Sequence, residues 1–75
     1  MYGDFVMEKS SATHVKEEAL RAVESLSRIL DFAKPGYSEA EYMALHKEVG
    51  LMIGQIQIGI LEPIYTEFPE LDDLG

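Results

Sequence analysis

The sequence has no cysteine and no tryptophan, and only 6 of its 75 residues are basic. Without cysteine the chain forms no disulfide, and a structural metal site loses its commonest ligand. Two reinforcements on which small folds often rely are therefore weakened or excluded. A chain of this length buries only about 60% of its unfolded surface when it folds alone. We therefore expect association with another chain to supply part of the stability.

Basic charge is scarce, because 14 acidic residues against 6 basic ones give a formal net charge of −8. This balance repels phosphate backbones and argues against direct binding of DNA or RNA. Hydrophobic residues make up 47% of the chain, which is too many for a disordered acidic protein. No basic segment followed by a long apolar run stands near Met1. We therefore expect no secretory signal and a cytoplasmic location.

The sequence also lacks the motifs that identify common enzymes and metal sites. It contains no Gly-x-Ser-x-Gly, no phosphate-binding glycine loop and no zinc signature. The residues three before His14 and His46 are Ser11 and Met43, so neither histidine completes the Glu-x-x-His pair of a di-iron bundle. We therefore name no catalytic, cofactor-binding or metal-binding residue. A lone histidine among apolar residues is expected to be a core or interface group.

The first long pattern is typical of an amphipathic helix over residues 11–33. At about 100° per residue, its apolar side chains fall within a sector of roughly 100° to 120°. They are Val15, Ala19, Ala22, Val23, Leu26, Ile29, Leu30 and Ala33. On the polar side, the spacing predicts two ion pairs that support the helix, Glu17 with Arg21 and Glu24 with Arg28. Residues 1–10 show no helical period and are expected to be an N-terminal extension.

A second helix is predicted over residues 39–61. Pro35 and Gly36 end the first helix, because proline restricts the residue before it and glycine favours a turn. Ser38 and Glu41 have the spacing of a capping box, in which each side chain accepts a hydrogen bond from the other residue's backbone N–H. The loop between the helices is short, so the two helices should lie side by side and antiparallel.

The second helix contains thirteen consecutive residues without charge, from Val49 to Leu61. A broad face of the helical wheel holds Tyr42, Leu45, His46, Val49, Met52, Ile53, Ile56, Ile60 and Ile64. Further round lie Met43, Leu51, Ile58 and Leu61. A helix that is apolar nearly all round needs more than one partner helix, and thirteen residues are too few to cross a bilayer. A strand over residues 55–60, where polar and apolar residues alternate, is the alternative that the length of the helical pattern disfavours.

Pro63 interrupts the second helix, because it lacks an N–H group and its ring clashes with the carbonyl of Gly59, four residues earlier. Two outcomes are compatible with this pattern. Either the helix kinks and continues to about Glu67, or it stops near Leu61 and a short helix follows.

Residues 69–75 form an acidic tail that begins at a proline, a residue favoured at helix starts. Phe68, Leu71 and Leu74 are spaced by three and resemble the apolar face of short peptides that bind partner grooves. We expect this triplet to fold back onto its own domain, because an exposed apolar triplet is unfavourable in water. Recognition of a partner protein by the same residues is the alternative.

Gly50 and Gly54 form a Gly-x-x-x-Gly pair within the second helix. Glycine inside a helix costs about 1 kcal/mol relative to alanine, and a close helix crossing would explain its presence. The crossing helix belongs either to a second subunit, which we favour, or to the first helix of the same chain. The predicted subunit interface consists of Val49, Gly50, Ile53, Gly54, Ile56, Gln57, Ile60 and Leu61.

Together these patterns predict an all-α fold, an antiparallel helical hairpin over residues 11–68 that pairs with a second copy into a four-helix bundle. The expected function is association, as a small non-catalytic scaffold or regulatory protein that forms homodimers or higher homo-oligomers and can bind a protein partner. An acidic inhibitor or nucleic-acid mimic that occupies a basic site on a partner is a second interpretation. A metal-dependent or hydrolytic bundle enzyme that collects Glu18, Tyr42 and His46 from different subunits is a third.

Overall fold

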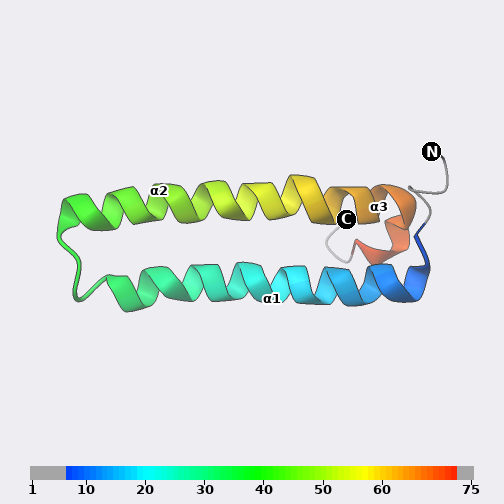
Figure 1. The fold of residues 1–75 in the computed structure, drawn as a ribbon, viewed down its shortest axis with the longest axis horizontal. Helices are drawn as coiled ribbons and strands as arrows, with labels where there is room; N and C mark the ends of the chain where they lie inside the picture. Colours follow the sequence, from blue (N-terminus) through cyan, green and yellow to red (C-terminus); the bar gives the residue numbers. More distant parts are fainter. Residues whose placement is uncertain (1–6, 73–75) are drawn as a thin grey trace.

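The computed structural model describes residues 7–72, which form two long helices and a shorter helical end. The elements are α1 (Lys9–Ala33), α2 (Glu39–Ile56), the π-helical turn η2 (Gln57–Leu61), α3 (Glu62–Glu67) and the 3-10 turn η3 (Pro69–Leu71). Figure 1 shows α1 and α2 side by side and antiparallel, with α3 continuing the line of α2 and the chain then turning back toward α1. The described residues contain no strand, so the all-α class is confirmed and the strand over residues 55–60 is excluded.

The helix boundaries follow local signals in the sequence. The capping box is confirmed, since the backbone N–H of Glu41 donates to Ser38 Oγ at 3.1 Å and the backbone N–H of Ser38 donates to Glu41 Oε1 at 3.0 Å. Helix α1 begins at Lys9, two residues before the predicted start. Lys9 and Ser10 are polar and exposed. The spacing of apolar residues, from which the start of the helix was predicted, therefore does not extend to them.

The two long helices meet along a narrow seam. On α1 the seam residues recur at alternating intervals of four and three, which is the spacing of a coiled-coil stripe. They are Ala12, Lys16, Ala19, Val23, Leu26, Leu30 and Ala33. On the other side of the seam, Val49, Leu61 and Ile64 are buried. Three of the seam residues of α1 are alanines, and such small side chains permit a close approach of the two helices.

The turn η2 changes which residues face α1. The seam of α2 passes from Ile56 to Leu61, an interval of five, because the backbone N–H of Glu62 donates to the carbonyl five residues back in Gln57. Leu61 is therefore 2% exposed and Ile60 is 39% exposed. The helical wheel placed Ile60 on the broad apolar face and Leu61 further round, and both positions were wrong. A wheel with a constant angle of about 100° per residue does not include the extra residue of the π-turn.

Pro63 explains why the wider turn occurs at this point. In a regular α-helix the Pro63 ring would clash with the Gly59 carbonyl, and a π-turn immediately before the proline opens the backbone there. The chain remains helical through Glu67, and α3 continues the line of α2 (Figure 1).

The hairpin is elongated, with dimensions of 48 × 24 × 19 Å and a radius of gyration of 15.5 Å. A compact chain of this length would have a radius of gyration of about 11 Å. Two helices in one layer cover only one stripe of each other. Much of the apolar surface of both helices is consequently left without a cover.

Candidate association surface

One side of the hairpin carries a row of apolar residues on each long helix. On α1, Val15, Ala22 and Ile29 are exposed and are spaced by seven, so they form a line along the helix. On α2, the half-buried Leu45 and the exposed Met52 are also spaced by seven, and the exposed Ile60 follows after eight because η2 adds one residue. These six residues are named the lateral face.

The two rows lie on the same side of the seam. Val15 and Ile60 line the same two surface hollows, which makes them neighbours across the seam. Because the helices are antiparallel, a step of seven residues toward the C-terminus of α1 corresponds to a step of seven residues toward the N-terminus of α2. The step that starts at Ile60 is one residue longer, because it crosses the π-turn η2. Ala22 therefore lies at the level of Met52, and Ile29 at the level of Leu45. The lateral face is two helices wide and about 21 Å long.

The two hollows lie along the lateral face and are mostly apolar. The larger hollow, of about 510 Å³, is bordered by Met7 and Ile64 as well as by Val15 and Ile60. The smaller hollow, of about 410 Å³, is bordered by His14 and Ile60 and by four further residues of α1 at intervals of i, i+3, i+4 and i+7, namely Val15, Glu18, Ala19 and Ala22. Four residues with this spacing form the hole that receives a side chain from a neighbouring helix in knobs-into-holes packing. The surface is thus shaped to pack against another helix.

A second exposed apolar surface lies on the side of α2 that faces away from α1. It consists of Met43, Leu51 and Ile58, all well exposed, and is named the outer stripe. Gly50 and Gly54 lie near it, and a Cβ atom built on either glycine meets nothing within 4 Å. Neither glycine is therefore needed for a close crossing with α1, which excludes the crossing within the same chain.

The structure distributes the predicted interface residues over several positions. Val49 and Leu61 are buried within the hairpin, where a second subunit does not reach them. Ile60 belongs to the lateral face. Ile53, Gly54 and Ile56 are half-buried, and Gly50 and Gln57 are exposed. Of the lateral face, the predicted interface therefore contained only Ile60.

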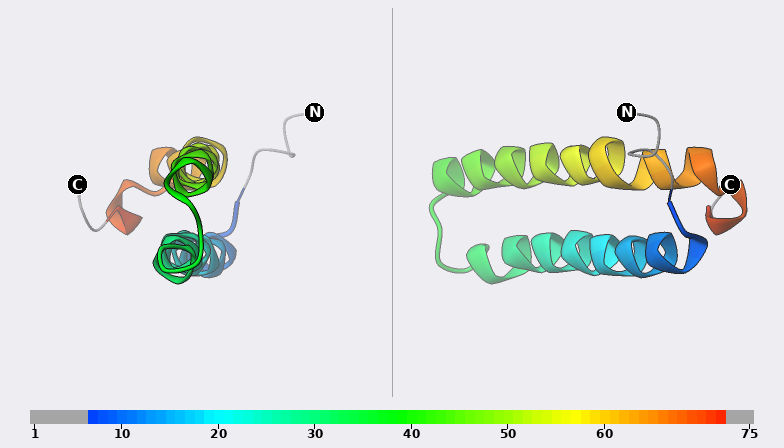
Figure 2. Two further views of the ribbon diagram at one scale, coloured as in Figure 1. Left: turned by 90° about the vertical axis from the view of Figure 1, so that its left-hand side faces the viewer. Right: turned by 45° about the vertical axis from the view of Figure 1, so that its right-hand side comes forward.

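The C-terminal turn is held against α1. Lys9 Nζ lies 3.0 Å from Glu70 Oε2, and Lys16 Nζ donates a hydrogen bond of 2.6 Å to the carbonyl oxygen of Leu71. Viewed along the hairpin, η3 lies to one side while residues 7–8 leave on the other (Figure 2, left). Because Met7 and Glu8 border the larger hollow, the lateral face is on the side opposite to η3.

The predicted partner-binding residues of the tail are placed in part. Phe68 and Leu71 are half-buried in the turn that lies on α1, whereas Leu74 lies outside the described residues. Sequence reasoning missed Lys16, which is 8% exposed and belongs to the seam. The sequence did contain a sign of this role. Lys16 stands between Ala12 and Ala19 at a heptad position, where the other seam residues of α1 are all apolar.

The residues considered for catalysis do not converge within one chain. His46 is exposed, with its ring centroid 6.2 Å from that of Tyr42. Glu18 receives a hydrogen bond of 2.6 Å from Arg21. The level of His46 on α2 is that of residue 28 on α1, about 15 Å along the axis from Glu18. Within residues 7–72, no three histidine, aspartate or glutamate residues are grouped so that they could hold a metal ion.

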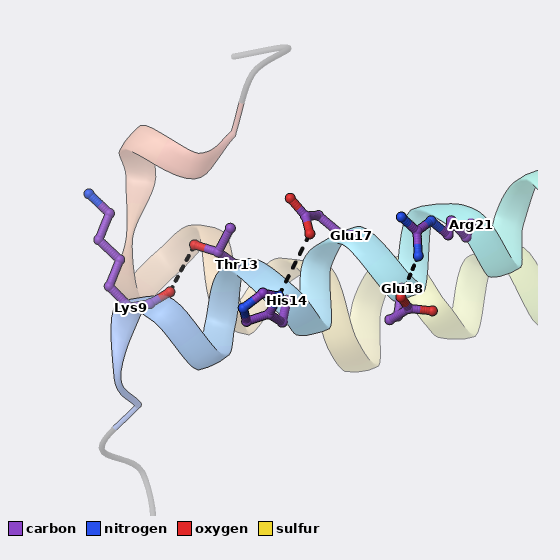
Figure 3. Close-up of polar contacts among 6 residues, drawn as sticks. All are labelled: Lys9, Thr13, His14, Glu17, Glu18 and Arg21. Atoms are coloured by element: carbon purple, nitrogen blue, oxygen red, sulfur yellow. Dashed lines mark hydrogen bonds and ion pairs between the residues drawn. The ribbon is translucent and has the colours of Figure 1, made fainter.

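Acidic side chains on the exposed surface of α1 lie close to basic ones, as Figure 3 shows for Glu18 with Arg21 and Glu17 with His14. Arg21 pairs with Glu18 at 2.6 Å, and not with Glu17 as predicted, since residues three apart are also neighbours on a helix. Glu17 Oε1 lies 3.8 Å from His14 Nδ1, and the predicted pair of Glu24 with Arg28 forms at 3.5 Å. Acidic residues on this helix are thus interspersed with basic ones.

Two carboxyl groups have lowered pKa values, and both shifts have structural causes. The hydrogen bond from the backbone N–H of Ser38 is the main cause of the lowered pKa of Glu41, and the Ser38 hydroxyl adds to it. For Glu70, a hydrogen bond from its own backbone N–H is the main cause of the lowered pKa, and the Lys9 ammonium adds to it. Local hydrogen bonds, from the capping box at Glu41 and mainly from the backbone N–H at Glu70, account for the lowered pKa values of both groups.

Within residues 7–72, no helix combines the length and the hydropathy that a bilayer span requires. Comparison of the chain with protein-family models, with curated proteins and with solved structures finds no match.

Proposed function

We propose that this protein is a small non-catalytic association module that acts as a helical homo-oligomer, in a scaffold or regulatory role. The observation that carries the proposal is the lateral face, a contiguous apolar surface that spans both long helices. Contiguous exposed apolar patches on small proteins mark interaction sites, whereas scattered apolar residues do not. A third and a fourth helix would cover this face as in a helical bundle.

The exposed area supports association as well. The chain exposes 5844 Å². A compact monomer of 8.4 kDa would expose roughly 4600 Å². The larger value follows from the elongated shape of the hairpin and includes polar as well as apolar surface. A standard protein interface covers roughly 800 Å² of each partner, and the elongated chain is large enough to present one of this size.

The acidic inhibitor receives less support from the described residues. Such an inhibitor would present a continuous run of carboxylates to a basic site. On α1, however, Glu18 and Glu24 are paired with arginines of the same helix. The net charge of −8 is in this case best explained as surface charge that keeps the hairpins dispersed in water.

Sedimentation equilibrium of the full chain between about 1 and 100 µM tests the proposal, because a standard interface of this size gives micromolar or tighter affinity. We expect the weight-average mass to rise from that of one chain toward an integral multiple of it. A mass equal to one chain at every concentration would contradict the proposed function.

A further inference from the structure

We infer that a second copy of this chain covers the lateral face, so that two hairpins stack face to face into a four-helix bundle and leave the outer stripe exposed. The inference rests on the proposed function and specifies which surface carries it. Three properties of the lateral face favour a second copy as its occupant.

The first property is the width of the face. Its two rows, one on each helix, lie at matching levels, so a single added helix would cover only part of it. A second hairpin supplies two antiparallel helices with the same spacing. A two-fold axis then lets each copy present the same surface to the other, as in most homodimers.

The second property is complementary shape. At the centre of the face, the small Ala22 lies at the level of the large Met52. The hollow of about 410 Å³ over Ala19 and Ala22 accepts a large apolar side chain from another helix. The face therefore contains both the projections and the holes that packing against a copy of itself requires.

The third property is charge. All six residues of the lateral face are apolar, and two carboxylates, Glu18 and Glu48, border it at its outer edges. Glu18 is already paired with Arg21 on the same helix. In the outer stripe, in contrast, the ammonium group lies within the surface, because Lys47 is four residues from both Met43 and Leu51 and stands between them on the same side of α2. Burying an ammonium group in an apolar interface is costly unless it is paired. A second copy is therefore accommodated better on the lateral face.

The chain itself leaves this face open over the described residues. The C-terminal turn, which could have covered an apolar row, lies on the opposite side of the hairpin (Figure 2). There it is anchored by Lys9 and Lys16. The described elements therefore leave the lateral face available to another chain.

Two adjacent residues of α2 provide a matched test. Met52 belongs to the lateral face and is 49% exposed, whereas Leu51 belongs to the outer stripe and is 56% exposed. Met52→Lys and Leu51→Lys change the net charge equally and place the new ammonium on different sides of the same helix. Ala22→Lys tests the row on α1, at a position that is exposed in the single chain.

The dissociation constant of the dimer is measured by sedimentation for each variant, and circular dichroism verifies the helical content. We expect Met52→Lys and Ala22→Lys to raise this constant at least tenfold, because two copies of the charge enter the interface, and Leu51→Lys to change it less than about twofold. Weakening by Leu51→Lys alone, or an unchanged constant for all three variants, would overturn the inference while the proposed function stands. A wild-type chain that is monomeric throughout would overturn the proposed function itself.

Discussion

At the scale of single residues, Lys16 connects two parts of the chain that are far apart in sequence. It occupies a seam position on α1 and is 8% exposed, and its Nζ donates to the carbonyl of Leu71 at 2.6 Å. An ammonium group this buried requires hydrogen-bond acceptors, and the C-terminal turn supplies one. The lysine therefore holds η3 against α1.

The substitution Lys16→Met keeps the length and packing of the side chain but removes the donor. Hydrogen bonds to charged groups contribute about 1.5 to 3 kcal/mol, so we expect local opening of the turn to increase at least tenfold. Hydrogen exchange of the Leu71 and Asp72 amides measures this opening. Lys9→Met, which removes only the exposed ion pair with Glu70, is the control and should have a smaller effect. Equal effects of the two variants would count against the role assigned to Lys16.

Gly54 is a second informative residue, because the space beside it is open. A Cβ atom at this position meets nothing within 4 Å, and the backbone is helical. We expect Gly54→Ala to raise the free energy of unfolding by about 0.5 to 1 kcal/mol, since alanine is the better helix former. Chemical denaturation measures the change, with Gly50→Ala as the matched variant. A loss of dimer affinity in Gly54→Ala would instead place a second chain against the glycines.

At the scale of secondary-structure elements, most boundaries were predictable because their signals are local. Ser38 and Glu41 specify the start of α2 through hydrogen bonds within four residues. Pro63 predicted a disturbance at the right place. The sequence did not predict that this disturbance is a π-turn, which keeps the helix continuous. The type of turn also depends on which side chain packs against α1. The burial of Leu61 in place of Ile60 is a tertiary effect.

The register role of η2 can be tested by removing its extra residue. Deletion of the exposed Ile58, combined with Pro63→Ala, brings the interval between Ile56 and the original Leu61 from five to four. We expect this variant to unfold within a few degrees of the wild type or above it, because the seam then continues as a regular α-helix. Thermal unfolding followed by circular dichroism measures the midpoint.

Deletion of the exposed Lys47 in the middle of α2 is the control for that experiment. It rotates all following side chains by about 100° relative to those before it, so the seam cannot form over its whole length. We expect loss of cooperative unfolding. If both deletions were equally damaging, the π-turn would not be the place where the register is adjusted.

At the scale of the whole molecule, the hairpin has a seam with few buried residues and a large exposed apolar surface. The buried apolar residues of the described chain are Ala12, Ala19, Ala33, Val49, Leu61 and Ile64. Three of these six are alanines, each of which removes little surface from water. A single hairpin is therefore weakly stabilised, and its folding should be coupled to association.

This coupling predicts that the unfolding temperature depends on protein concentration. We expect the midpoint to rise by about 3 to 5 °C for each tenfold increase in concentration, because mass action favours the folded dimer. Scanning calorimetry or circular dichroism over two decades of concentration measures the shift. The Met52→Lys variant should lose the dependence, and a wild-type midpoint that does not move would contradict the coupling.

The sequence by itself determined the all-α class, the two long helices and the capping box, because periodicity and caps act within a few residues along the chain. The sequence also predicted the apolar sector of α1, but it did not indicate which part of that sector packs against α2 and which part stays exposed. Only the tertiary structure divided that sector into a seam with Ala19 and Leu26 and an open row with Val15, Ala22 and Ile29. The division depends on where α2 lies, and a straight helix can cover only one stripe of its neighbour. For the same reason, tertiary packing decided between Ile60 and Leu61, since burial depends on the neighbouring helix as well as on the helical period.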